Sequence, residues 1–537
     1  MKKSISILVV SFWVLLSCQL VASPQITQPP AADLPSSTNT ASPLPVETKT
    51  TLPPTEAPPV LPTIVPSSTA TPPPITRMGP EEFPPGYNPL SGLKVEDPEN
   101  LTYPPIMVSV SNFPPAARPQ AGLDWCPSVY EGYIGDGETR FLATFYGDYP
   151  KLGGRAAASL PMDSADFVPV SFPAQETTPE TPAENLPVLS DHPTLKAPGI
   201  GPIRSARIWY GEAAKLHQAT LAFAHAWPGV LAKLPQNYIT INPLDDSDIN
   251  SGFLDVTKLQ THAMNLPNRL EPTDLAGNLF DLNPPEASAS GWESGSAIMP
   301  VSWREDALPQ SSWIGKPADT VWIPWSNLSQ IFWRYDEESG AYHRYQDQAD
   351  AKTFVQAIDR LSGRPLTFEN LIILFANHTI LYPNAQGKSY VYEIELLYVQ
   401  KFPAILFRDG KMYNIYWTTI SGEYERKTGR ARPIRYMDEA GNPFPLKPGQ
   451  TWVTIMPPGV RLDVKEVPPF DFEAKRAVRK ITVEFGDAAP AGMKTAEYQQ
   501  DVFYLDEMES RYPMRYKNKQ EGSGTWLIPF AESYILP

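Results

Sequence analysis

The chain has 537 residues, enough for about three domains, and 62 of them are proline. The formal net charge of −15 argues against a nucleic-acid binder, which needs clustered positive charge. With two cysteines and six histidines, none of them closely paired, a disulfide-stapled scaffold and a Cys-rich zinc site are excluded. We therefore expect no metal and no cofactor.

The N-terminus has the pattern of a secretory signal. Two lysines precede an apolar run that is too short to span a bilayer comfortably. The run ends in Leu-Leu-Ser-Cys, which is similar to the lipobox of bacterial lipoproteins, although Leu16 stands where a smaller residue is usual. We predict a signal peptide over residues 1–17 and a lipid on Cys18. Plain secretion with cleavage near residues 21–23, and an uncleaved anchor, are the alternatives.

Residues 18–82 are predicted to be a disordered linker. From Val21 to Pro80 there are 16 prolines and 17 serines and threonines. Such a segment buries too little apolar surface to offset the entropy of ordering it. Pro-rich linkers extend by about 3.1 Å per residue, so this segment fits a stalk between a membrane and a folded body.

The folded body begins with a predicted N-terminal domain of mixed α/β type over residues 83–300. A Pro-rich insertion at 157–199 interrupts it. Two patterns define its secondary structure, β-rich apolar runs and one helical run with Ser205 as a candidate N-cap. The runs predict strands at 106–110, 129–134, 140–146 and 220–226, a helix from Ser205 to His217, and a second helix with Pro228 in its first turn.

Residues 318–458 are predicted to form a second, mostly antiparallel β domain. Aromatic and polar residues alternate along many short runs, and Asp409-Gly410 is a tight hairpin signal. At β spacing these aromatic residues favour core packing over sugar stacking. Residues 459–537 form a C-terminal extension. The fold class is therefore α+β.

Motifs in both halves carry a resemblance. The N-terminal half contains NPLSGLKV, ARPQAGL, SVYEGYIGDGETRFLATF, GPIRSAR and the histidine of AFAHA; the C-terminal half contains FWRYDEESGAYHRYQD, NLIILFANH, ILFRDGKMYNIYW and GNPFPLKPGQTWVTIMP. Together they resemble the YerB-like bacterial lipoprotein family, in the order and number that family shows. The resemblance implies a two-domain α+β lipoprotein outside the cytoplasm, and no activity. The sequence departs from the family pattern at residues 135–140. Relatives tend to have Glu-Gly-Gly-x-Thr-Arg there, whereas this chain has Gly-Asp-Gly-Glu-Thr-Arg, with its glutamate at Glu138, so the family's acidic position is displaced.

One constellation of polar residues is a candidate ligand site, because guanidinium forks bind carboxylate or phosphate bidentately. A helix N-terminus at Ser205 would add backbone N–H donors. The competing interpretation is a structural network in which the arginines pair with Glu131, Asp136 and Glu138. The candidates are Arg118, Gln120, Glu131, Thr139, Arg140, Arg204, Ser205, Arg207 and His225.

His225 is the best single candidate for a catalytic group, since ligands collect at strand ends of α/β units. A lone histidine in an apolar strand is more often a hydrogen-bonded core residue, and Cys126 has no local imidazole that would activate it.

The sequence thus predicts a lipid-anchored, extracytoplasmic binding or regulatory module of the cell envelope without catalysis of its own. Its expected partners are the membrane, through the N-terminal lipid, and a cell-envelope glycan or other anionic ligand. Two alternatives stay open: an enzyme that acts on an envelope polymer with the Arg/Glu/His cluster, and a structural adaptor that docks an envelope protein.

Overall fold

A computed structural model describes residues 75–135, 138–150, 195–196, 199–243, 250–285, 315–326, 329–349, 353–383, 390–457, 463–465, 475–484 and 495–504. The predicted signal peptide, Cys18 and nearly all of the linker lie outside these residues, as does nearly all of the insertion at 157–199. No helix in the described ranges is long and apolar enough to cross a membrane.

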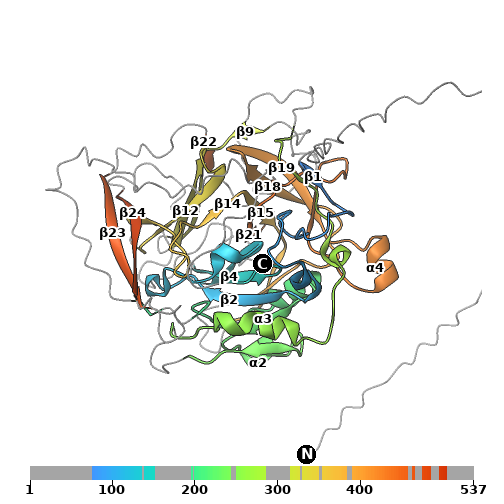
Figure 1. The fold of residues 1–537 in the computed structure, drawn as a ribbon, viewed down its shortest axis with the longest axis horizontal. Coiled ribbons are helices and arrows are strands. Elements are labelled where there is room, and N and C mark those ends of the chain that lie inside the picture. Colours follow the sequence, from blue (N-terminus) through green and yellow to red (C-terminus); the bar gives the residue numbers. More distant parts are fainter. Residues whose placement is uncertain are drawn as a thin grey trace, which may run out of the picture. The chain divides into compact units, whose positions relative to one another are not determined.

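The described residues form an α+β fold, as expected, with two large sheets. The first has eleven strands. In spatial order they are β20 (Arg435–Met437), β19 (Lys411–Thr418), β18 (Phe402–Arg408), β15 (Asn370–Phe375), β21 (Thr451–Met456), β3 (Ser128–Gly135), β4 (Glu138–Phe145), β2 (Ile106–Ser111), β6 (Thr220–Phe223) and β7 (Tyr238–Thr240), with β9 (Lys316–Pro317) paired to β19. Figure 1 shows β2, β4, β21, β15, β18 and β19 following one another.

The second sheet has nine strands and is antiparallel except at its β5 edge. Its order is β22 (Asp463–Lys465), β10 (Thr320–Ser326), β11 (Ser329–Asp336), β12 (Ala341–Asp347), β13 (Thr353–Gln356), β24 (Thr495–Tyr504), β23 (Lys475–Glu484) and β5 (Leu195–Lys196), with β14 (Thr367–Phe368) paired to β12. Two small pairs join β1 (Arg77–Met78) to β8 (Phe280–Asp281) and β16 (His378–Pro383) to β17 (Tyr390–Ile394).

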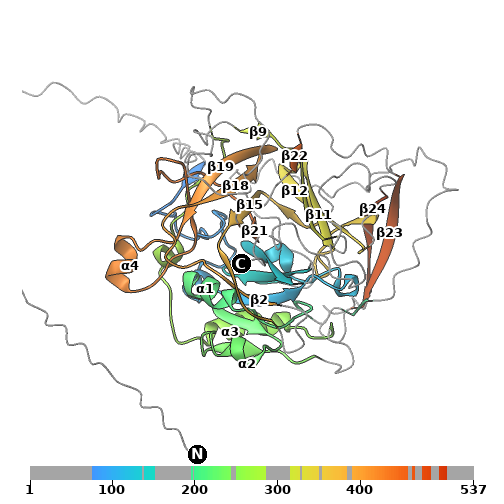
Figure 2. The same ribbon diagram turned by 180° about the vertical axis from the view of Figure 1, so that it is seen from behind.

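The α-helices in the described ranges are short. They are α1 (Trp209–Leu216), α2 (Pro228–Leu231), α3 (Val256–Met264) and α4 (Glu423–Thr428). Figure 2 shows α1, α2 and α3 gathered at the β2 end of the eleven-stranded sheet.

Strands from both halves of the chain share the eleven-stranded sheet. The junction is a parallel pairing of β21 with β3, in which Thr451 lies opposite Ser128 and Thr454 opposite Glu131. The residues predicted for the N-terminal domain (83–300) and the C-terminal domain (318–458) are therefore joined by backbone hydrogen bonds in one sheet.

The core lies on both faces of this sheet, and the period of two along each strand divides its side chains. On β4, Phe141 enters the cluster shared with the nine-stranded sheet, whereas Leu142 enters the cluster under α1. On β21, Trp452 and Val453 divide in the same way. Trp333 of the second sheet packs edge-on against Trp452 at 5.2 Å, so these aromatic side chains belong to the core, as predicted.

The hairpin predicted at Asp409-Gly410 is confirmed. Arg408 pairs with Lys411, and both turn residues have positive φ, 53° and 66°. This is the backbone of the two-residue turns whose twist matches the flanking strands.

The predicted helix from Ser205 begins later than expected. Backbone hydrogen bonds hold residues 204–206 extended: Arg204 N–H donates to Ser109 at 3.0 Å and Ala206 N–H donates to His225 at 2.9 Å. Helix α1 consequently starts at Trp209, with Ile208 as its N-cap and no side-chain cap. The prediction of Ser205 as an N-cap is wrong, and so is that of helix N–H donors at this position.

Candidate functional site

The nine predicted site residues divide into three places. Glu131, Thr139, Arg118 and Gln120 lie in a buried network. Arg140, Arg204, Ser205 and Arg207 form a second group, and we call these four residues the arginine cluster. His225 is exposed and follows the end of β6, so it is neither in a strand nor in the core. The core interpretation of this histidine is wrong.

The buried network is centred on the Glu131 carboxylate, which is fully buried. It accepts hydrogen bonds from Thr139 Oγ1 at 2.7 Å and from Trp452 Nε1 at 3.0 Å, and it forms an ion pair with Arg344 at 3.3 Å. The Arg344 guanidinium also lies over the Trp452 ring, 4.4 Å from its centroid. Glu131 is therefore paired with Thr139 of its own half and with Arg344 and Trp452 of the other half, two partners that the sequence pattern could not identify.

Arg118 and Gln120 are also structural. Arg118 donates from Nε to the Asn112 carbonyl at 2.8 Å and from Nη1 to the Asp347 carbonyl at 2.5 Å. Gln120 Nε2 donates to the Ser111 carbonyl at 3.0 Å. Burial lowers the pKa of Arg118 to about 10. These two residues fix the loop between β2 and β3 and connect it to β12.

The arginine cluster is organised around Ser205. Arg140 Nη1 donates to the Ser205 carbonyl and hydroxyl, both at 3.1 Å, and Arg207 Nη1 donates to the same hydroxyl at 3.0 Å and to the Ala206 carbonyl at 2.9 Å. Within the described part of the chain, neither Arg140 nor Arg207 has a carboxylate within ion-pair distance. Asp136, one of the acids of the structural interpretation, lies outside the described residues.

Burial is the largest influence on the pKa values of Arg140 and Arg207. Burial lowers the pKa of Arg140 to about 9, and the neighbouring charges of Arg207 and Arg204 act in the same direction. Burial also lowers the pKa of Arg207, with Arg204 contributing, while Glu138 opposes the shift. Like charges disfavour one another's ionised form, so an anion bound between these guanidiniums would stabilise the cluster.

The half-burial of Ser205 and Arg207 leaves part of the cluster accessible, whereas Arg140 is buried behind them. Chemically, the arrangement offers fixed N–H donors of positive charge, which suit a carboxylate or a phosphate.

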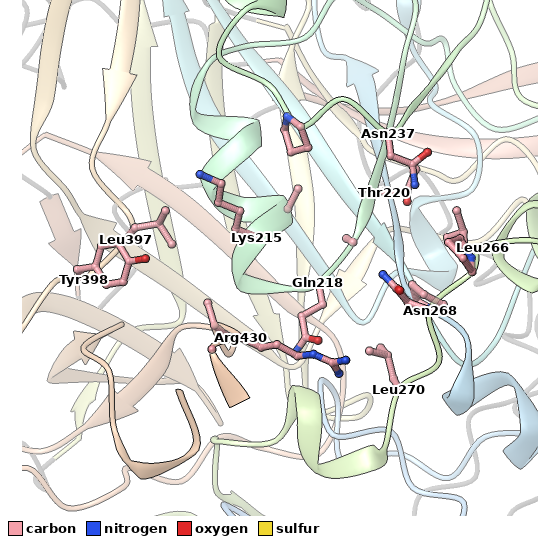
Figure 3. Close-up of a pocket in the computed structure, with 17 residues that line it drawn as sticks. Lys215, Gln218, Thr220, Asn237, Leu266, Asn268, Leu270, Leu397, Tyr398 and Arg430 are labelled. Atoms are coloured by element: carbon pink, nitrogen blue, oxygen red, sulfur yellow. Dashed lines mark hydrogen bonds between the residues drawn. The ribbon is translucent and has the colours of Figure 1, made fainter. Parts of the chain in front are cut away.

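A separate cavity of about 420 Å³ lies elsewhere in the body, and none of the nine predicted residues lines it. Figure 3 shows it with Lys215 and Gln218 at the end of α1, Asn268 after α3, and Tyr398 and Arg430 from the C-terminal half. Sequence reasoning missed these residues because they come from separate turns and loops without a motif.

Comparisons with known proteins match both halves. A family model described as "Protein of unknown function (DUF3048) N-terminal domain" matches residues 90–163, and the corresponding C-terminal domain matches residues 321–453. A solved structure that resembles this one is the crystal structure of YerB protein from Bacillus subtilis. It is 19% identical, the match covers 69% of this chain and 96% of that chain, and the TM-score is 0.44. No curated protein matches the chain.

Proposed function

We propose that this chain, whose two halves match the N-terminal and C-terminal domain models of one family of unknown function, is a lipid-anchored, extracytoplasmic binding module. It holds an anionic group of a cell-envelope component at the arginine cluster. The proposal of an anchor rests on the signal pattern of residues 1–17, on Cys18 and on the Pro-rich stalk that follows.

The arginine cluster carries the proposal of binding. Two guanidiniums, those of Arg140 and Arg207, converge on one serine hydroxyl and have no carboxylate partner among the described residues. Glu131, the acid that would have paired with them in a structural network, is occupied by Arg344, Thr139 and Trp452. Buried or half-buried charges are ordinarily paired, so the cluster favours an anion supplied from outside.

A carboxylate or a phosphate fits the donors equally, and envelope polymers carry both. Titration calorimetry with the full chain separates them, with glycerol 3-phosphate as one probe, N-acetyl-D-alanine as the other and neutral N-acetylglucosamine as the reference. We expect saturable binding of at least one anion that weakens with rising salt, since charge-assisted contacts near the surface are screened.

Variants assign the binding to the cluster. Arg207→Gln removes a half-buried charge. The affinity for the anion should fall by tenfold or more, since a hydrogen bond to a charged group contributes about 1.5–3 kcal/mol. Arg77→Ala is the matched control, because Arg77 is an exposed arginine elsewhere on the surface. If no anion binds, and Arg207→Gln only lowers the free energy of unfolding, the cluster is structural and the proposal fails.

The anchor has its own test. The full chain and its Cys18→Ser variant, expressed with the intact N-terminus, should partition differently. The first should fractionate with membranes and carry a diacylglycerol adduct in mass spectra, and the second should not. An unmodified thiol at position 18 would refute the anchor.

A further inference from the structure

The cavity shown in Figure 3 is built by both halves of the chain. The N-terminal half supplies the end of α1, the segment before β7 and the segment after α3. The C-terminal half supplies Leu397, Tyr398 and residues 429–431. Its volume of about 420 Å³ falls in the range of small-molecule sites, about 300–1,000 Å³, which favour such junctions.

Three exposed polar side chains line the cavity and have no partner in the part of the chain that the structure describes. The Lys215 ammonium group and the amides of Asn237 and Asn268 form no hydrogen bond or ion pair with any residue in the described ranges. They provide one positive charge and two groups that can both donate and accept. These ammonium and amide groups suit a ligand that is rich in hydroxyl groups and carries a negative charge.

Gln218 supplies a fixed acceptor. Its Nε2 donates to the Asp274 carbonyl at 3.1 Å, to the Tyr424 hydroxyl at 3.2 Å and to the Ala431 carbonyl at 3.2 Å. With the amide nitrogen committed, Oε1 is held in place and accepts nothing from the described residues. It is left to accept from a ligand hydroxyl.

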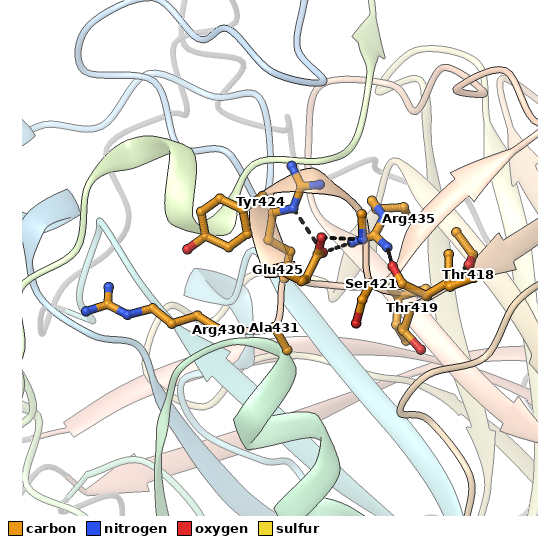
Figure 4. A network of polar contacts seen from close by, with 12 residues as sticks. Thr418, Thr419, Ser421, Tyr424, Glu425, Arg430, Ala431 and Arg435 are labelled. Carbon is orange, nitrogen blue, oxygen red and sulfur yellow. Dashed lines mark hydrogen bonds and ion pairs between the residues drawn. The ribbon is translucent and has the colours of Figure 1, made fainter. Parts of the chain in front are cut away.

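Arg430 brings a second positive charge to the cavity. It is half exposed, it lines the cavity, and it contacts Asp274 through Nη1 at 3.3 Å. Figure 4 shows why this wall is preorganised. The Glu425 carboxylate in helix α4 forms ion pairs with Arg435 at 2.6 Å and with Arg432 at 3.2 Å. These ion pairs fix the segment after α4, which carries Arg430, to the helix.

Tyr398 adds an exposed ring beside Leu397. Its exposure is 71%, and its φ of 62° is a left-handed conformation that is rare for a bulky residue. A flat ring on the rim of a polar cavity provides a surface for the C–H face of a sugar, while the amides and charges take its polar groups.

We propose that this cavity binds an acidic saccharide of one or two rings, with its carboxylate at Lys215 and its hydroxyls at Gln218, Asn237, Asn268 and Arg430. The site is distinct from the arginine cluster, and the inference does not depend on the function proposed for that cluster. A peptide is the alternative ligand, and the test separates it from the saccharide.

The test is calorimetry on the full chain with the disaccharide N-acetylglucosaminyl-N-acetylmuramic acid. N,N′-diacetylchitobiose, called chitobiose below, is the matched probe, since it lacks only the lactyl ether and its carboxylate. The peptide Ala-Leu-Ala is the third probe. We expect saturable binding of the acidic disaccharide with a Kd below about 1 mM, and at least tenfold weaker binding of the other two.

Variants complete the design. Lys215→Ala should remove the preference for the acid over chitobiose, whereas Tyr398→Ala should weaken both sugars, and Lys94→Ala, an exposed lysine away from the cavity, should change neither. Arg207→Gln should leave disaccharide binding intact, which separates this site from the cluster. Absence of binding, equal binding of chitobiose, tighter binding of the peptide, or binding untouched by Lys215→Ala would each overturn the proposal.

Discussion

The ion pair between Arg344 and Glu131 offers a quantitative prediction, because it joins the two halves of the chain inside the core. The two side chains are 1% and 0% exposed. Replacing Arg344 by Met keeps much of its volume against Trp452 but leaves the carboxylate with two neutral donors. Removing one partner of a buried pair costs about 3–5 kcal/mol, so Arg344→Met should lower the free energy of unfolding by that amount.

Urea denaturation of the full chain, followed by tryptophan fluorescence, measures this loss. A double-mutant cycle then isolates the pair, with Glu131→Gln as the second change. The single amide oxygen of Gln can still accept from Trp452, and its amide nitrogen can donate to the Thr139 hydroxyl. The double variant should therefore be at least about 2 kcal/mol more stable than the sum of the single losses implies. Additive losses, or an Arg344→Met cost below about 1 kcal/mol, would refute the reasoning.

Three further predictions concern pH, backbone and packing. Burial lowers the pKa of His217 and of His378 to about 4. Because the unfolded histidines take up protons near pH 6.5, the free energy of unfolding should fall as the pH falls from 6.5 towards 4, by about 2 kcal/mol per histidine at pH 5. In urea titrations, His217→Gln should remove half of this pH dependence. Tyr398→Gly should raise the melting temperature, because the strain of an L-residue at φ 62°, about 1–2 kcal/mol, exceeds the entropic cost of glycine, about 0.5–1 kcal/mol. An unchanged or lower melting temperature would contradict this. Gly132→Ala should cost about 1–3 kcal/mol in urea titrations, because its Cβ would lie 2.7 Å from the buried Trp209 ring; a neutral effect would show that the ring can shift.

Local patterns predicted much of the secondary structure. The strands at β2, β3 and β4, the strand at β6 and the turn at Asp409-Gly410 follow from alternation and turn chemistry, which act over a few residues. The prediction of the helix start was wrong because contacts with residues distant in the sequence decide where the helix begins. Residues 204–206 are held extended by Ser109 and His225, and no local preference of Ser205 could show these contacts.

The site was predictable only in part, because its pairings are long-range. Arg344 contacts Glu131 across 213 residues of sequence, and Trp452 does so across 321. Without these partners, Glu131 looked like a neighbour of Arg140, whereas the structure separates it from the arginine cluster. The cavity was not predictable for the same reason, since its lining comes from segments as far apart in the sequence as Pro104 and Ala431.

The central claim, that an anion binds between Arg140 and Arg207, is tested most directly by diffraction from crystals of the full chain soaked in selenate, a phosphate-like anion with an anomalous scatterer. The account predicts a selenium peak within hydrogen-bonding reach of both guanidiniums, and its loss in Arg207→Gln crystals. A soak that places selenium only at other surface sites, with the two guanidiniums still sharing Ser205 alone, would contradict it.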